Sequence, residues 1–183
     1  MPISLVHAQQ PYPSTWRSYR RPLCHTVPRH WQVWLQDKGS LTQRLVHASN
    51  GQFSVRVVRN QWGIPSASEA KILKLKPRQR AIIREVELLC HGQVWVCARS
   101  IIPHGTLTGR LRRFKNIGDK PLGALLFKHP NMVRGPLQVT CLIQQPSQQQ
   151  HWARRSVFYL DDKAILVTEV FMPPMATISP QDV

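Results

Sequence analysis

Hydrophobic and polar residues alternate along several parts of the chain, a pattern typical of half-buried β-strands. The alternation is clear in residues 52–60, and again in the two runs that flank His91-Gly92 within residues 80–103. Because two β-rich runs joined by two residues favour a tight turn, residues 80–103 are predicted to form a β-hairpin. Two or three further strands are predicted closer to the C-terminus, in residues 136–145, 154–160 and 164–172.

Helical patterns lie between these strands. Residues 30–48 contain two of them, and Ser40 with Gln43 three residues later has the form of a capping box at the start of the second. Other helical segments are predicted at residues 66–73 and 106–118, with a short helix opening at Pro121. Most strands are joined by hairpins and not by long helical crossovers. The predicted fold class is therefore α+β, a single antiparallel sheet with helices packed on it.

The length of 183 residues fits one domain with a single core. Residues 1–28, rich in proline and polar residues, are predicted to be an irregular N-terminal leader. Residues 29–176 are predicted to form the folded domain, and residues 177–183 a C-terminal tail. No apolar run reaches the roughly 18 residues of a membrane span, and the N-terminus lacks the features of a signal peptide. We therefore expect a cytoplasmic protein without stable membrane insertion.

The chain is strongly basic, with 25 Lys+Arg against 9 Asp+Glu and a formal net charge of +16. Such an excess attracts anions, which could be nucleic acid, an acidic membrane surface or a small dianionic metabolite. The basic residues are spread along the whole chain, and the six tryptophans lie mostly within apolar patterns. Nucleic-acid binding favours a basic stripe with exposed aromatic side chains, so we do not expect it here.

Charged residues occupy positions where the strand pattern predicts an apolar face. Counting back from His91-Gly92 places Arg84 opposite Arg99 on such a face. Like charges in apolar surroundings need a negative group nearby. In the last strand, Glu169 likewise shares its predicted face with apolar residues only. Two interpretations stay open: a buried Arg–Glu ion pair without function, or a pocket with a cationic end for a carboxylate and an acidic end for a hydroxyl.

Four fragments resemble the chorismate pyruvate-lyase family in order and spacing. They are GSLTQRL (39–45), REVELLCHGQVWVCARSIIP (84–103), KPLGALLF (120–127) and RRSVF followed by ILVTEVFMP (165–173). The resemblance covers roughly residues 31–173. It implies an antiparallel sheet with helices on one side and a ligand buried beneath two helical flaps. It also implies that Arg84 binds the ring carboxylate, that Glu169 binds the hydroxyl at the opposite end, and that backbone groups at Leu41 and Leu122 complete the contacts.

The activity implied by the resemblance is the splitting of chorismate into 4-hydroxybenzoate and pyruvate, an early step of ubiquinone or other quinone biosynthesis. We hypothesise that Arg99 stabilises the enolpyruvyl side of the substrate. No cofactor is expected, because aromatisation supplies much of the driving force. No metal site is predicted either, because the cysteines and histidines lack the spacing of metal ligands.

The expected partner is the small-molecule substrate chorismate, bound by a monomer. The alternative is a non-enzymatic sensor domain of the same fold, as found in the effector-binding domains of some transcription regulators. Such regulators usually carry a separate DNA-binding domain, for which residues 1–30 are too short and irregular.

Overall fold

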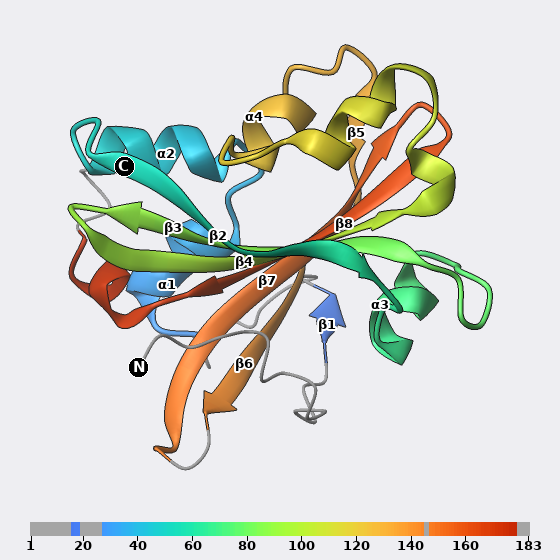
Figure 1. The fold of residues 1–183 in the computed structure, drawn as a ribbon. Coiled ribbons are helices and arrows are strands. Elements are labelled where there is room, and N and C mark those ends of the chain that lie inside the picture. The colour runs from blue at the N-terminus through green and yellow to red at the C-terminus, as the bar shows by residue number, and fades with distance from the viewer. Residues whose placement is uncertain (1–15, 19–26, 145–146, 179–183) are drawn as a thin grey trace.

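A single antiparallel sheet organises the protein, whose computed structural model describes residues 16–18, 27–144 and 147–178 (Figure 1). Its strands follow the spatial order β1-β6-β7-β8-β4-β3-β2, and β5 pairs with β7 outside this path. The strands are β1 (Arg17–Ser18), β2 (Phe53–Gly63), β3 (Ala81–Cys90), β4 (Gln93–Pro103), β5 (Met132–Arg134), β6 (Gln138–Gln144), β7 (Gln149–Leu160) and β8 (Lys163–Phe171). The predicted fold class is confirmed.

The central hairpin β3–β4 turns at His91 and Gly92, both with positive φ angles, as a tight turn of two residues requires. The pairing predicted beyond this turn is wrong. A β-bulge leaves Trp95 without a partner, because Leu88 pairs with Val96 while the next residue of β3 pairs with Val94. The register shifts by one residue, and every position further along β4 changes faces relative to the prediction.

The shift separates the two arginines that were predicted to lie opposite each other. Arg84 pairs with Ser100, and Arg99 pairs with Glu85. Because side chains alternate between the faces of a strand, Arg84 and Arg99 lie on opposite faces of the sheet. We call the side of Arg84 the pocket face and the side of Arg99 the outer face.

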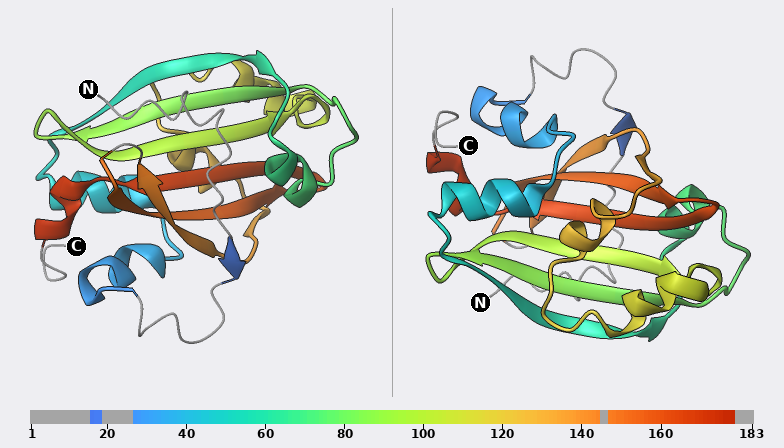
Figure 2. Two further views of the ribbon diagram at one scale, coloured as in Figure 1. Left: turned by 90° about the horizontal axis from the view of Figure 1, so that it is seen from below. Right: turned by 90° about the horizontal axis from the view of Figure 1, so that it is seen from above.

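Helices α1 (Arg29–Leu35), α2 (Leu41–Ala48) and α4 (Leu122–Leu126) pack against the pocket face. Figures 1 and 2 show α2 and α4 lying over the central strands, with the 3-10 helix Gly109–Asn116 beside them. The short helix α3 (Ala67–Ile72) lies against the outer face instead. The predicted cap of α2 is present, since the Ser40 hydroxyl accepts a hydrogen bond from the Gln43 amide.

The hairpin β7–β8 fixes a pairing that the sequence left open. The turn consists of Asp161 and Asp162, so that Leu160 pairs with Lys163 and Arg154 lies directly opposite Glu169. Most of the predicted leader, part of the loop 144–150 and most of the C-terminal tail lie outside the described residues. No helix in the described part of the chain is long and apolar enough to span a membrane.

Candidate active site

A small cavity of about 40 Å³ lies between the pocket face and the two helices α2 and α4. Its floor comes from β3, β4, β7 and β8, and its roof from the starts of α2 and α4. The lining residues are Gly39, Leu41, Thr42, Arg84, Val86, Leu88, Ala98, Ser100, Pro121, Leu122, Gly123, Leu126, Phe127, Arg134, Phe158, Val167 and Glu169. Four of the five sequence-predicted site residues are among them: Arg84, Glu169, Leu41 and Leu122.

The roof closes tightly over this space. A Cβ atom placed on Gly123 of α4 would lie 3.2 Å from the Thr42 hydroxyl oxygen of α2. Ligand pockets commonly enclose roughly 300–1,000 Å³, far more than this cavity. In this arrangement the cavity has room for only a few waters, and a larger ligand requires residues that line it to move.

Arg84 is a buried cation that has no carboxylate as hydrogen-bond partner in the part of the chain that the structure describes. Its side chain donates from Nη2 to the Gly118 and Lys120 carbonyl oxygens, at 3.0 and 2.9 Å. Its Nε has no hydrogen-bond partner among the described residues. Burial lowers the pKa of the Arg84 guanidinium to about 10, partly opposed by the nearby charge of Asp119. The group is thus still charged at neutral pH, and its free donor suits an anion in the pocket.

Glu169 reaches the same cavity from β8, with its side chain 13% exposed. Its Oε2 accepts a hydrogen bond of 2.5 Å from Nε of the fully buried Arg154. This pair agrees with the ion-pair interpretation as far as Glu169 is concerned. The same carboxylate also lines the cavity, so its ion pair with Arg154 does not exclude contact with a ligand.

Arg134 is a second cation in the cavity lining, and the sequence analysis missed it. It sits in β5, a strand of three residues that was not predicted, and its guanidinium lies 5.0 Å from the Phe158 ring centre. Its Nη2 lies 3.9 Å from Oε2 of Glu169. A sequence signal was available: Arg134 stands between apolar residues and Gly135-Pro136, where a turn leads into a predicted strand.

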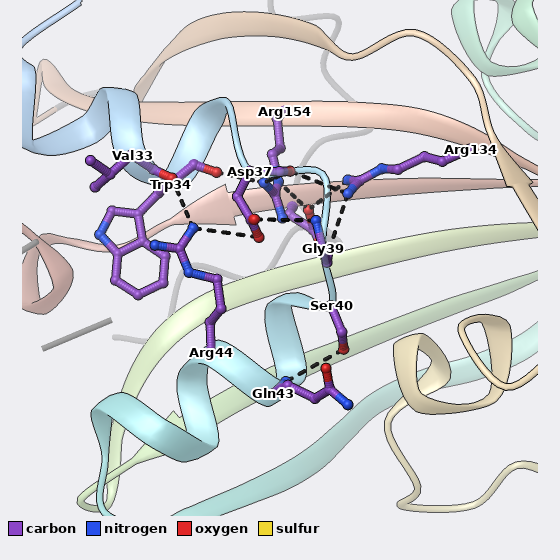
Figure 3. A network of polar contacts seen from close by, with 10 residues as sticks. Val33, Trp34, Asp37, Gly39, Ser40, Gln43, Arg44, Arg134 and Arg154 are labelled. Atoms are coloured by element: carbon purple, nitrogen blue, oxygen red, sulfur yellow. Dashed lines mark hydrogen bonds and ion pairs between the residues drawn. The ribbon is translucent and has the colours of Figure 1, made fainter.

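Arginine side chains from the sheet fix the loop between α1 and α2 through hydrogen bonds, as Figure 3 shows. Arg154 donates from Nη1 to the carbonyl oxygens of Trp34 (2.5 Å) and Asp37 (2.8 Å). Arg134 donates from Nη1 to those of Asp37 and Gly39, each at 3.3 Å. Since α2 begins directly after this loop, these bonds fix where its first residues sit over the cavity.

Arg99 does not reach the cavity, and its predicted place there is wrong. On the outer face it forms ion pairs with Glu69 of α3 and with Glu85 of β3, and its Nε lies 2.7 Å from Oε1 of Glu69. Burial alone would raise the pKa of Glu69, but the hydrogen bond and charge of Arg99 outweigh it and leave that pKa lowered. The bulge at Trp95 is the physical reason for the error, because it turns Arg99 away from Arg84.

Two arginines line the cavity, Arg84 and Arg134, which suits a ligand with two anionic groups. The carboxylate of Glu169 lines it too, Asp119 lies near Arg84, and Asp37 lies near Arg134. Arg84 and Glu169 belong to strands on either side of β4 and pair with residues two apart on it. With usual strand spacings their Cα atoms are roughly 12 Å apart.

Comparison with solved structures supports the fold. The effector domain of PhnF from Mycobacterium smegmatis superposes with a TM-score of 0.52 at 13% sequence identity, covering 74% of this chain and 90% of that domain. At this level of identity the likeness concerns the fold alone.

Comparison with sequences reaches further. A protein of Marinobacter nauticus named "Probable chorismate pyruvate-lyase" is 40% identical over 82% of this chain and 80% of its own length. One of the same name from Aromatoleum aromaticum is 36% identical over 90% of this chain and 95% of its own. The family model described as chorismate lyase matches residues 14–179. The chain therefore belongs to the chorismate lyase family.

Proposed function

We propose that this protein is a chorismate pyruvate-lyase that converts chorismate into 4-hydroxybenzoate and pyruvate. The observation that carries the proposal is that Arg84 and Glu169 line the same cavity, from strands on either side of β4. Chorismate has a carboxylate at C1 and a hydroxyl at C4, at opposite ends of its ring. A buried arginine with a free donor suits the first group, and a carboxylate suits the second.

In this proposal the ring carboxylate of chorismate lies against Arg84, and the C4 hydroxyl donates to Glu169. Backbone groups at Leu41 and Leu122, on the two helices of the roof, complete the contacts. The ether bond at C3 breaks, the hydrogen at C4 is lost, and the ring becomes aromatic. The departing enolpyruvate gains a proton at its methylene carbon and becomes pyruvate, so that all atoms are accounted for.

The protein residues would act mainly by positioning and electrostatics. Holding both ends of the ring fixes one reactive conformation, and an apolar, closed roof keeps water from the reacting bonds. The gain in aromatic stabilisation drives the reaction, which is why we propose that no cofactor is needed. We further propose that the protein acts as a cytoplasmic monomer at an early step of ubiquinone or other quinone biosynthesis, because 4-hydroxybenzoate is a precursor of the quinone head group.

The test is to mix purified protein with chorismate, without added metal or cofactor, and to follow 4-hydroxybenzoate and pyruvate by chromatography. We expect both products in equal amounts, well above the slow spontaneous breakdown in a control without protein. Treating the protein with a chelator beforehand should leave the rate unchanged. If a folded sample gives no product above the control, the lyase proposal fails.

The same experiment separates the enzyme from a sensor domain of this fold. A sensor would bind chorismate or 4-hydroxybenzoate without turning chorismate over. Calorimetric titration with both compounds therefore belongs beside the assay, so that binding without turnover is recognised. The similarity to an effector domain is one of fold only and does not favour this alternative.

A further inference from the structure

Chorismate carries two carboxylates, and the contacts proposed above account for one of them. The second belongs to the enolpyruvyl group and is absent from 4-hydroxybenzoate. Burying it in a closed cavity without a cationic partner would be costly. Resting on the proposed function, we infer that Arg134 binds the enolpyruvyl carboxylate and so distinguishes the substrate from its aromatic product.

Arg134 has the contacts that this role requires. Its side chain is only 10% exposed, and it lines the cavity together with Arg84. Its Nε donates to the Ser156 hydroxyl at 2.8 Å, and its Nη1 faces the Asp37 and Gly39 carbonyl oxygens. These bonds hold the guanidinium in place. Its Nη2, by contrast, makes no hydrogen bond among the described residues, which leaves a donor for a ligand.

The position of Arg134 agrees with the connectivity of chorismate. The enolpyruvyl ether is attached at C3, next to the C4 hydroxyl assigned to Glu169. With the ether turned away from the ring, its carboxylate lies on the side of Glu169 and not on that of Arg84. The Nη2 of Arg134 lies 3.9 Å from Oε2 of Glu169, close enough for one ligand to touch both side chains.

Two other arginines with little exposure, Arg154 and Arg99, are less suited to this role. Arg154 is fully buried behind Glu169, with Nε on that carboxylate and Nη1 on backbone carbonyls, and it does not line the cavity. Arg99 faces away on the outer side of the sheet. Arg84 is already assigned to the ring carboxylate. Among the described residues that line the cavity, Arg134 is therefore the cation that remains for the second carboxylate. From there it would also stabilise the negative charge of the departing enolpyruvate.

The test compares Arg134→Met with wild type in two measurements, kcat/KM for chorismate and Kd for 4-hydroxybenzoate. Loss of a charged hydrogen-bond partner in a buried site should lower kcat/KM on the order of 100-fold. The Kd for 4-hydroxybenzoate should change little, because that product has no enolpyruvyl group. Arg134→Lys keeps the charge but loses the planar guanidinium, so its kcat/KM should lie between those of Arg134→Met and wild type. Arg84→Met should both lower kcat/KM for chorismate and raise the Kd for 4-hydroxybenzoate.

Arg134 also anchors the α1–α2 loop, so the control must disturb this loop without touching the cavity. Arg44→Gln does so: Arg44 donates to the Val33 carbonyl at 2.9 Å and pairs with Asp37, and it does not line the cavity. A purely structural change should shift both measurements alike, as we expect for Arg44→Gln.

Equal losses in both measurements for Arg134→Met and Arg134→Lys would overturn the inference and assign Arg134 to the loop alone. Wild-type kcat/KM in Arg134→Met would also overturn it. If Arg134→Met does not fold, the ratio of the two measurements in Arg134→Lys decides in the same way. A wild-type protein that produces no 4-hydroxybenzoate would instead defeat the proposed function, before any variant is compared.

Discussion

Arginine occupies two kinds of buried position in this protein, and its neighbours decide what it does in each. Arg99 is surrounded by two carboxylates, which satisfy its charge within the protein. Among the described residues, Arg84 donates to backbone carbonyls only and keeps a free donor beside a cavity. The sequence identified both residues as unusual, because each interrupts an apolar strand. It could not separate them, because the partners that do so come from α3 and from residues 118–120, far away along the chain.

At this scale we predict that Arg99→Met is a stability variant. Removing its charge leaves Glu69 and Glu85 buried without their partner, so the free energy of unfolding should fall by about 3–5 kcal/mol. The kcat/KM for chorismate of the folded protein should stay close to wild type, since Arg99 lies on the outer face. Denaturant unfolding and a steady-state assay on the same sample check both statements.

The variant Arg99→Met with Glu69→Gln and Glu85→Gln is the matched control. It removes the whole charge cluster and should recover part of the lost stability, because no buried carboxylate is then left unpaired. A strong loss of kcat/KM with normal stability in Arg99→Met would contradict our placement of this residue and restore a role in catalysis.

At the scale of elements, alternation and capping signals predicted most strands and helices of the fold, because both depend on neighbouring residues. Two features that shape the site were not predicted. The bulge at Trp95 is one extra residue in an otherwise regular strand, and no local pattern marks it. Strand β5 has three residues, too few for an alternation to show, and it is defined by its pairing with β7. The second omission concealed Arg134.

The contact between α2 and α4 yields a prediction about access to the cavity. In the double variant Thr42→Cys, Gly123→Cys, a Cβ atom at position 123 would lie 3.2 Å from the Thr42 hydroxyl oxygen, whose place the new sulfur at position 42 takes, close enough for a disulfide. We expect the oxidised form to lose nearly all turnover, because the roof can no longer open, and a reductant to restore it. Each single variant, oxidised in parallel, serves as control. Full turnover with the disulfide verified by mass spectrometry would show that substrate enters by another route.

At the scale of the whole molecule, the net charge of +16 accompanies a cavity lined by Arg84 and Arg134. A basic protein surface raises the local concentration of anions and speeds their encounter with the site. The excess of basic residues is spread over the chain and not gathered in one tract. A spread of this kind suits a general attraction of small anions. The sequence alone did not identify the anion, because a net charge does not specify the size or geometry of the anion that it attracts.

We predict that salt slows the binding of chorismate and leaves the chemical step unchanged. Between low and high ionic strength, kcat/KM for chorismate should fall on the order of tenfold, while kcat changes little. The affinity for 4-hydroxybenzoate, a monoanion, should fall less steeply over the same salt series. Stopped-time assays at several chloride concentrations measure the first effect, and calorimetry measures the second. A kcat/KM independent of salt would mean that long-range attraction contributes nothing.

The bulge at Trp95 has a consequence for how this hairpin can change during evolution. Beyond that residue, β4 presents Ala98 and Ser100 to the cavity and Arg99 to the carboxylates of the outer face. Deleting one residue between the bulge and Ala98, with the bulge kept, would shift the register of the rest of the strand by one residue and exchange the two sets. A guanidinium would then enter the cavity while two buried carboxylates lost their partner. A substitution in β4 thus affects one face of the sheet at a time, whereas a single-codon deletion beyond the bulge would disrupt the cavity and the outer charge cluster together.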